Sequence, residues 1–162
     1  MASMGAVYGP QGGTPRIFNY NAASAATFIT GAVLVFAAGE VVEAGVNPAA
    51  GTIVGVAAAP AGGAPGSNMA NQPAVITWRD RKCPVYLANG NIFKANLVNG
   101  SSVIIAPVAT DIGASYGLSA FGGVWYVDQS KTAGTARVVV DKADFDTNEV
   151  YFRIIEAFAT EI

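Results

Sequence analysis

The chain has 162 residues, which is long enough for one domain with a single hydrophobic core. Only 12% of the residues are charged, against about 25% in an average soluble domain, so much of the exterior must be uncharged and suited to contact with partners. The net charge of −2 gives no electrostatic footprint for nucleic acid, and the absence of histidine removes the commonest general base and metal ligand.

Residues 1–15 are rich in Gly, Pro and Ala and follow neither the helical nor the strand period, so they predict an extended arm. The apolar motif RIFNY follows, and its large side chains would be costly to leave in water. Up to Trp78 the charged residues are Arg16, Glu40 and Glu43, which makes the first half of the chain the more interface-like half. The residues expected to contact a neighbouring subunit or a shell are Tyr8, Arg16, Ile17, Phe18, Tyr20 and Phe28.

Residues 21–28 combine a capping asparagine with an alanine-rich run and predict at most one short helix. Residues 22–38 carry no charge, but they fall short of the about 20 predominantly apolar residues that a membrane span requires. The segment before them lacks a positively charged region, so no secretory signal is expected, and we expect the mature chain to begin near Met1. An arm with a short helix at 1–30 and one β domain at 31–162 are therefore expected.

Short β-branched runs separated by turn residues follow, and this spacing predicts an all-β fold, a small β-barrel or β-sandwich. The first four runs lie at 32–36, 52–57, 74–78 and 84–88. The Pro- and Gly-rich stretch 60–73 predicts a long loop and a second candidate for contacts with a neighbour. Cys83 is the only cysteine, so no disulfide can form within the chain, and we interpret it as a small, partly buried strand residue.

Two Asn-Gly pairs, at 89–90 and 99–100, flank the run NIFKANLV. Asn-Gly readily adopts the positive φ angles of tight hairpin turns, so the pattern predicts three consecutive antiparallel strands. Within the middle strand Phe93, Ala95 and Leu97 share one face, as expected of a half-buried strand with a side-chain period of two.

The C-terminal half repeats this alternation. The segments 123–128 and 136–141 are joined by QSKTAGT and predict another hairpin, with Trp125 and Val138 in the core. Residues 149–154 alternate between apolar and polar side chains, which predicts a long closing strand.

Three features carry candidate chemistry, and each has a simpler interpretation. Ser115 lies in a G-x-S-x-G motif, but no histidine can complete a triad and no lysine spacing singles out a base, so the motif predicts a glycine-bounded turn. The acidic loop 141–149, taken as a calcium loop, lacks the sixth-position glycine and would place Ile155 at its twelfth position, so it predicts a solvated turn. The glycine pairs lack the helix and lysine of a phosphate site. No catalytic, cofactor-binding or metal-binding residue is predicted.

The segment GEVVEAGVNPAAGTIVGVAAAPA at 39–61 combines a Gly-Glu turn, a short strand, a turn and a returning strand. It resembles the opening pattern of tailed-phage capsid decoration, or cement, proteins, and GGVWYVDQS, ARVVVD and NEVYFRII are similar to their closing segments, so the similarity covers roughly residues 31–158. The resemblance implies a β-tulip-like domain that binds an expanded icosahedral shell, commonly as a homotrimer, and clamps adjacent subunits of the major capsid protein. The stretch 60–73 and the apolar arm depart from the family pattern.

These features predict a structural protein of the virion rather than an enzyme. We expect it to be made in the host cytoplasm, to need no cofactor, and to bridge neighbouring subunits on the outer capsid surface through its arm. A carbohydrate-binding β-sandwich on a virion or cell surface is the alternative, and a serine hydrolase using Ser115 is a third. The strand aromatics that could form a sugar-binding face are Trp78, Tyr86, Trp125, Tyr126 and Tyr151. Such residues more often serve the core or subunit contacts, so the sugar-binding interpretation ranks second.

Overall fold

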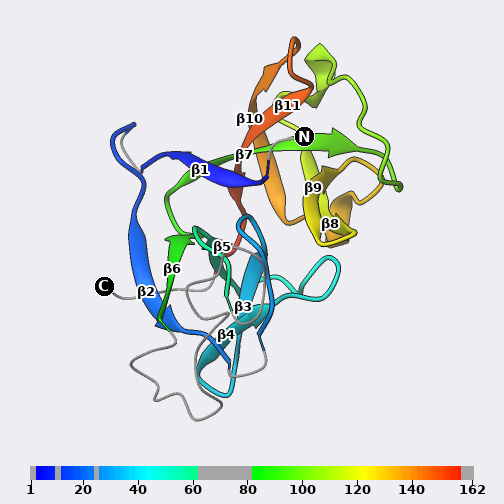
Figure 1. Ribbon diagram of the computed structural model, residues 1–162. Helices are drawn as coiled ribbons and strands as arrows, with labels where there is room; N and C mark the ends of the chain where they lie inside the picture. Colours follow the sequence, from blue (N-terminus) through cyan, green and yellow to red (C-terminus); the bar gives the residue numbers. More distant parts are fainter. Residues whose placement is uncertain (1–2, 10–11, 24–25, 62–81, 158–162) are drawn as a thin grey trace.

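The computed structural model describes residues 3–9, 12–23, 26–61 and 82–157. These residues form eleven β-strands in two sheets, which Figure 1 shows in two separate parts of the molecule. The helical segments among them are two three-residue 3-10 turns, Ala109–Asp111 and Ala133–Thr135. The prediction of an all-β fold is confirmed, and the arrangement belongs to the small barrel or sandwich class. The expected strand at 74–78, with Trp78, and nearly all of the stretch 60–73 lie outside the described residues.

The first sheet has the strand order β2-β6-β5-β3-β4, and every neighbouring pair is antiparallel. Its strands are β2 (Ile17–Asn21), β3 (Val33–Ala37), β4 (Glu40–Glu43), β5 (Ile53–Ala57) and β6 (Lys82–Leu87). The sheet curls until its two edge strands meet, because Ala22 forms a bridge with Val41 and the Ala23 N–H donates to the Val41 carbonyl oxygen at 3.1 Å. In the fully buried β5, Gly55 lets β6 approach closely, since a β-carbon there would overlap the Tyr86 carbonyl oxygen.

The second sheet is a closed barrel with one added strand. Its strands are β1 (Gly5–Tyr8), β7 (Ile92–Val98), β8 (Ser115–Phe121), β9 (Val124–Asp128), β10 (Val138–Asp144) and β11 (Glu149–Ile154). The order β7-β11-β10-β8-β9 is antiparallel, and a parallel pairing of β9 with the end of β7 closes the ring. β1 is antiparallel to the first half of β7.

Alternating apolar residues fill the barrel, as the sequence predicts. Phe93 on β7 and Phe152 on β11 are fully buried, and their rings stack with centroids 5.8 Å apart. Trp125 and Val138 are 2% and 0% exposed, which confirms both as core residues. The closing strand expected at 149–154 is confirmed as β11.

The three-stranded meander predicted around the Asn-Gly pairs is wrong, because β6 and β7 belong to different sheets. The first pair forms a turn, with Gly90 at φ 87°, but this turn carries the chain from one sheet to the other. The buried side chain of Asn91 fixes the crossing. Its amide nitrogen donates to the carbonyl oxygens of Arg16 (2.8 Å) and Leu87 (3.0 Å), and its oxygen accepts the Arg16 N–H at 2.9 Å. After the second pair the chain continues as an irregular loop.

The hairpin predicted between 123–128 and 136–141 is also wrong. β9 pairs with β8, whereas β10 pairs with β11 and β8. The turn from β8 to β9 is Gly122-Gly123, and both glycines adopt positive φ angles, of 60° and 79°. The connection after β9 contacts β8 instead of turning back on β9, because the Gly117 N–H donates to the Lys131 carbonyl oxygen at 2.7 Å.

The N-terminal segment belongs to both sheets, which differs from the expected arm at 1–30 beside a domain at 31–162. β1 pairs with β7 and β2 pairs with β6 of the same chain, so the extended backbone finds its hydrogen-bond partners within the domain. The described residues of the stretch 21–28 contain no helix, because the Ala23 N–H is already bonded to strand β4. Just before β1, Met4 is 2% exposed and is part of the core.

The burial of Met4 makes the N-terminus a stabilising element. We expect Met4→Ala to lower the free energy of unfolding by about 2–5 kcal/mol, because the change removes buried apolar contacts and leaves a cavity. The matched control is Ser3→Ala at the exposed neighbouring position, which should change the value by less than about 0.5 kcal/mol. Urea denaturation measures both, and equal stability of the two variants would contradict the docking of this segment.

Candidate functional site

Exposed large apolar side chains mark the places where this chain can contact partners. Among the described residues, the large hydrophobic side chains that are more than a third exposed are Tyr8, Ile17, Phe18, Ile29, Val46, Val103, Val108, Ile112 and Phe145. Three locations account for most of them: strand β2, the loop between β7 and β8, and the turn between β10 and β11.

The start of β2 exposes two large apolar side chains in succession. Ile17 and Phe18 are 50% and 42% exposed, and they project to opposite faces of the sheet because side chains alternate along a strand. Arg16 before them is also exposed, and we call these three residues the β2 surface. β2 pairs with β6 on one side and reaches β4 only at its far end, through Ala22. An edge strand with exposed apolar side chains is suited to contact another protein.

The aromatic side chain of the β2 surface is held in place by its neighbours. The Phe18 ring lies 4.8 Å from the Tyr20 ring, and the Tyr20 ring lies edge-on to Phe36 of β3 at 5.2 Å, both measured between centroids. Such aromatic pairs contribute beyond simple burial. A side chain that is already ordered loses little conformational entropy when a partner covers it.

The β2 surface carries an exposed cation without an ion pair among the described residues, as strand β10 does at Lys142, which lies over the Tyr151 ring. Arg16 forms no ion pair with any described residue. The other described cations in ion pairs have partners in the barrel: Lys94 with Glu149, Lys131 with Asp128, and Arg153 with Asp141. The β2 surface therefore offers one exposed cation beside two apolar side chains.

The structure places the predicted contact residues in different environments. Arg16, Ile17 and Phe18 lie together and exposed, Tyr20 is half-buried behind Phe18, and Tyr8 is 45% exposed on β1 of the other sheet. The prediction for Phe28 is wrong.

Phe28 is 2% exposed and packs in the core of its own chain. Its carbonyl oxygen accepts the Ala61 N–H at 2.9 Å, which fixes the segment against the residues that follow β5. The sequence predicted at most one short helix here with Phe28 as a contact residue, whereas residues 26–29 have no regular secondary structure and the ring is buried.

The loop between β7 and β8 is a second apolar surface that the sequence reasoning missed. Val103, Val108 and Ile112 are 66%, 53% and 46% exposed. The only charged residue from 99 to 113 is Asp111, which is 1% exposed and accepts hydrogen bonds from Tyr116 (2.5 Å), Gln129 (2.8 Å) and the Val108 N–H (2.7 Å). The signal that could have found this loop is the absence of charge between Lys94 and Asp111.

Ser115 is the first residue of strand β8 and Gly117 lies within that strand, so only Gly113, at φ 86°, is in a turn and the predicted glycine-bounded turn is wrong for the rest of the motif. It lines a cavity of about 390 Å³ together with Arg137 and Glu156. Arg137 is engaged with backbone carbonyl oxygens, including that of Pro48 at 2.5 Å. The described lining contains no lysine.

A different serine, Ser119, lies near a lysine and a carboxylate. Lys131 donates to Ser119 (2.5 Å) and Asp128 (2.6 Å), and Ser119 donates to Asp128 at 2.5 Å. Ser119 and Asp128 are 1% and 0% exposed, so no substrate reaches them. Asp128 also accepts from Ser130 and from the Gly100 N–H at 2.9 Å, so this cluster ties the ends of β7, β8 and β9 together.

Protonation of Asp128 makes the stability of the folded state depend on pH. Burial alone would raise the pKa of Asp128, but hydrogen bonds from Lys131, Ser119, Ser130 and Gly100 together hold it well below its ordinary value. A carboxyl group whose pKa is lowered on folding stabilises the folded state above its unfolded pKa of about 3.9, and this stabilisation is lost as the pH falls below that value.

We expect Asp128→Asn to lower the free energy of unfolding by about 3 kcal/mol at pH 7, because the buried carboxylate cluster loses its charge and the partly buried Lys131 loses its counter-charge. The loss of stability below about pH 4 should be shallower in this variant than in the wild type. Asp141→Asn, which breaks the exposed pair with Arg153, is the matched control and should cost less than about 1 kcal/mol. Circular dichroism follows the loss of folded structure as the pH falls. An equally steep loss of stability below about pH 4 in wild type and Asp128→Asn would refute this role.

The acidic segment 141–149 contains the end of β10, the turn 145–148 and the start of β11, so the interpretation as a solvated turn is confirmed only for 145–148, and Glu149 is buried. Asp144 Oδ1 accepts the N–H groups of Asp146 (3.0 Å) and Thr147 (3.3 Å), and hydrogen bonds from the Thr147 and Asp146 N–H groups lower the pKa of Asp144. No group of His, Cys, Asp or Glu side chains suited to a metal ion occurs among the described residues. Phe145 projects from this turn and is 54% exposed.

Cys83 is a buried residue of β6, as predicted, and burial raises the pKa of its thiol to about 11. At pH 8 the thiolate fraction should fall about 100-fold below that of an ordinary thiol, so the folded chain should react slowly with Ellman's reagent. Urea should restore one fast-reacting thiol. Ser102→Cys in a Cys83→Ala background places a thiol at an exposed site and is the positive control. Rapid stoichiometric labelling of the folded wild type would contradict the burial.

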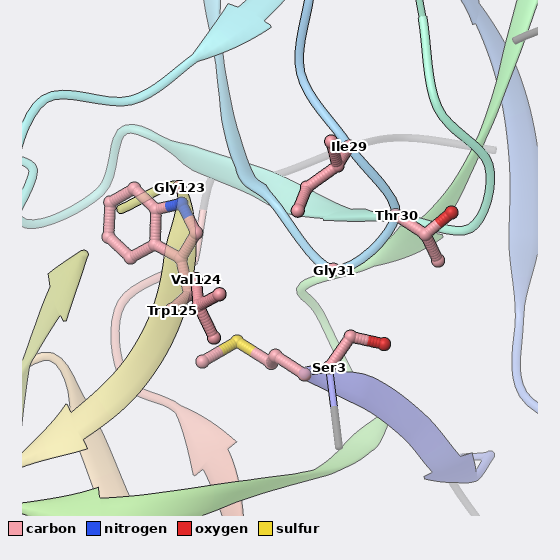
Figure 2. Close-up of a pocket in the computed structure, with 8 residues that line it drawn as sticks. Ser3, Ile29, Thr30, Gly31, Gly123, Val124 and Trp125 are labelled. Atoms are coloured by element: carbon pink, nitrogen blue, oxygen red, sulfur yellow. The ribbon is translucent and has the colours of Figure 1, made fainter. Parts of the chain in front are cut away.

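An apolar pocket of about 210 Å³ lies where the segment before β1, the segment before β3 and the β8–β9 turn meet. In Figure 2 the side chains of Val124 and Trp125 lie on one side and Ile29 on another, while the hydroxyl groups of Ser3 and Thr30 point away from them. The pocket is smaller than the about 300–1,000 Å³ typical of small-molecule sites. Trp125 is buried there and donates to Glu43 at 2.9 Å.

Among the described residues, no helix is long and apolar enough to cross a membrane, and the stretch 22–38 contains strand β3. Comparison with protein-family models found no match, and comparison with curated proteins found none either. The resemblance to capsid decoration proteins therefore stays a prediction, and the exposed β2 surface and β7–β8 loop are the features from which a function can be argued.

Proposed function

We propose that this chain is a virion structural protein that binds the outside of a tailed-phage capsid shell and stabilises it as a decoration protein. The observation that carries the proposal is the β2 surface, where Ile17 and Phe18 lie half exposed at a sheet edge in a chain that is only 12% charged. Exposed apolar side chains of this kind mark contacts with other proteins. The resemblance of residues 31–158 to decoration proteins supports the same function.

Two apolar surfaces suit a protein that bridges subunits. The β2 surface and the β7–β8 loop lie on different sheets, so one copy can contact two neighbours at once. The partners we propose are the major capsid protein and further copies of the chain, in a homotrimer on the outer capsid surface. Many weak identical contacts then combine into strong attachment, because each bound copy raises the effective concentration of the next contact.

The sugar-binding alternative has less support. A carbohydrate site needs aromatic rings that face solvent, but Trp125 and Tyr126 are each 2% exposed. Tyr86 and Tyr151 are partly buried, and Trp78 lies outside the described residues. None of the four described rings is as exposed as Ile17 or Phe18, which offer an apolar surface to a partner.

Co-sedimentation with expanded shells of the cognate major capsid protein tests the proposal. Ile17→Ser with Phe18→Ser should weaken binding by a factor on the order of 100 or more, because each buried apolar side chain contributes on the order of 2 kcal/mol. Point substitutions replace deletion of residues 1–20, since deletion would remove β1 and β2 from their sheets.

Val46→Ser is the matched control, because Val46 is 60% exposed but lies in the β4–β5 connection, away from β2 in the sequence and in the strand pairing. It should bind shells like the wild type. Thermal unfolding of all three proteins shows whether the domain stays intact. Equal shell occupancy of the double variant and the wild type would exclude the β2 surface from attachment.

A further inference from the structure

Phe145 is the most exposed aromatic side chain in the described parts of the chain, at 54%. It lies in the β10–β11 turn, which is well fixed: Asp144 Oδ1 accepts two backbone N–H groups, and Asn148 closes the turn with a φ angle of 57°. Thr147 donates its hydroxyl to Glu149 at 2.9 Å and braces the same turn. The phenyl ring is therefore displayed on a rigid tip, an arrangement suited to insertion into a partner.

The charge beside this ring is the opposite of the charge on the β2 surface. Asp146 follows Phe145, is exposed, and forms no ion pair with a described residue. On the β2 surface, Arg16 precedes Ile17 and Phe18 and is likewise unpaired among described residues. Each location thus combines exposed apolar surface with one available charge, and the two charges have opposite signs.

The two locations cannot meet within one molecule. Figure 1 shows the tip of the β10–β11 hairpin at the top of the molecule and β2 at the lower left, in different sheets. Complementary surfaces at different ends of one chain meet only between copies. A contact of this type is head-to-tail, and it closes into a ring when the rotation between copies allows closure.

We propose that the β10–β11 tip of one copy docks on the β2 surface of a second copy. Phe145 packs against Phe18, and Asp146 pairs with Arg16, which precedes Phe18 by two residues. The inference rests on the proposed function, because it names a second copy as the occupant of the β2 surface within the assembly on the shell.

The β7–β8 loop is a poorer partner for the tip. Its exposed side chains Val103, Val108 and Ile112 are apolar, but its single charge is Asp111, which is buried and negative. An acidic tip gains no ion pair there. The β2 surface is the location among those described that supplies both the apolar area and the cation.

The test measures the mass of the isolated full-length chain by sedimentation velocity over a range of concentrations. The wild type should form a defined multimer. Phe145→Ser should weaken self-association by about 30-fold or more, since burial of one aromatic ring contributes on the order of 2 kcal/mol. Val103→Ser removes an exposed apolar side chain from the β7–β8 loop and should leave the mass unchanged.

Charge reversal tests the pairing itself. Arg16→Asp and Asp146→Arg should each weaken self-association by about tenfold, because each places like charges together. The double variant, with both reversals in every copy, should restore the wild-type mass. Restoration is specific to a direct contact, because two independent folding defects would add instead of cancelling.

A monomeric wild type, an unchanged mass in Phe145→Ser, or a double reversal that fails to restore the multimer would each overturn the inference. Shell co-sedimentation separates this failure from failure of the proposed function. If the wild type is a monomer that still binds expanded shells, the contact between copies is wrong and the proposed decoration function is supported. If the chain forms the expected multimer but does not bind shells, the contact is supported and the proposed function is wrong.

Discussion

The side-chain amide of Asn91 is the constraint on which the arrangement of the two sheets depends. It is fully buried and bonds both backbone groups of Arg16 and the carbonyl oxygen of Leu87, so it joins the start of β2, the end of β6 and the start of β7 at one point. Buried polar groups without partners are costly, and this amide has a partner for each of its bonds. The position of Ile17 and Phe18 at the molecular surface follows from where Asn91 holds Arg16.

Three acidic side chains are buried in the described part of the chain. Asp111, Asp128 and Glu149 are at most 5% exposed, and each is held by hydrogen bonds or an ion pair. The surface is therefore even poorer in charge than the 12% composition suggests. The buried acids fix the loops around the barrel, and the uncharged exterior that remains fits a protein that works in an assembly.

Local patterns in the sequence predicted which residues are buried, but not which strands are neighbours. Phe93, Leu97 and Phe152 follow a period of two that any half-buried strand must show, so their burial could be read directly. The partners of β6 and β9 depend on contacts distant in sequence, such as those of Asn91 and Asp128, which leave no local signature. Ile17 and Phe18 are exposed, and large apolar side chains beside a Gly- and Pro-rich segment are conspicuous in the sequence, but their contact with a partner stays a prediction. Phe28 was misplaced, since its environment is set by the tertiary packing of a backbone that looked helical.

The bond between Arg16 and Asn91 also has a mechanical consequence. β2 is linked to the barrel through the Asn91 amide at Arg16 and to the first sheet through its pairing with β6. A load on β2 is therefore shared between the two sheets.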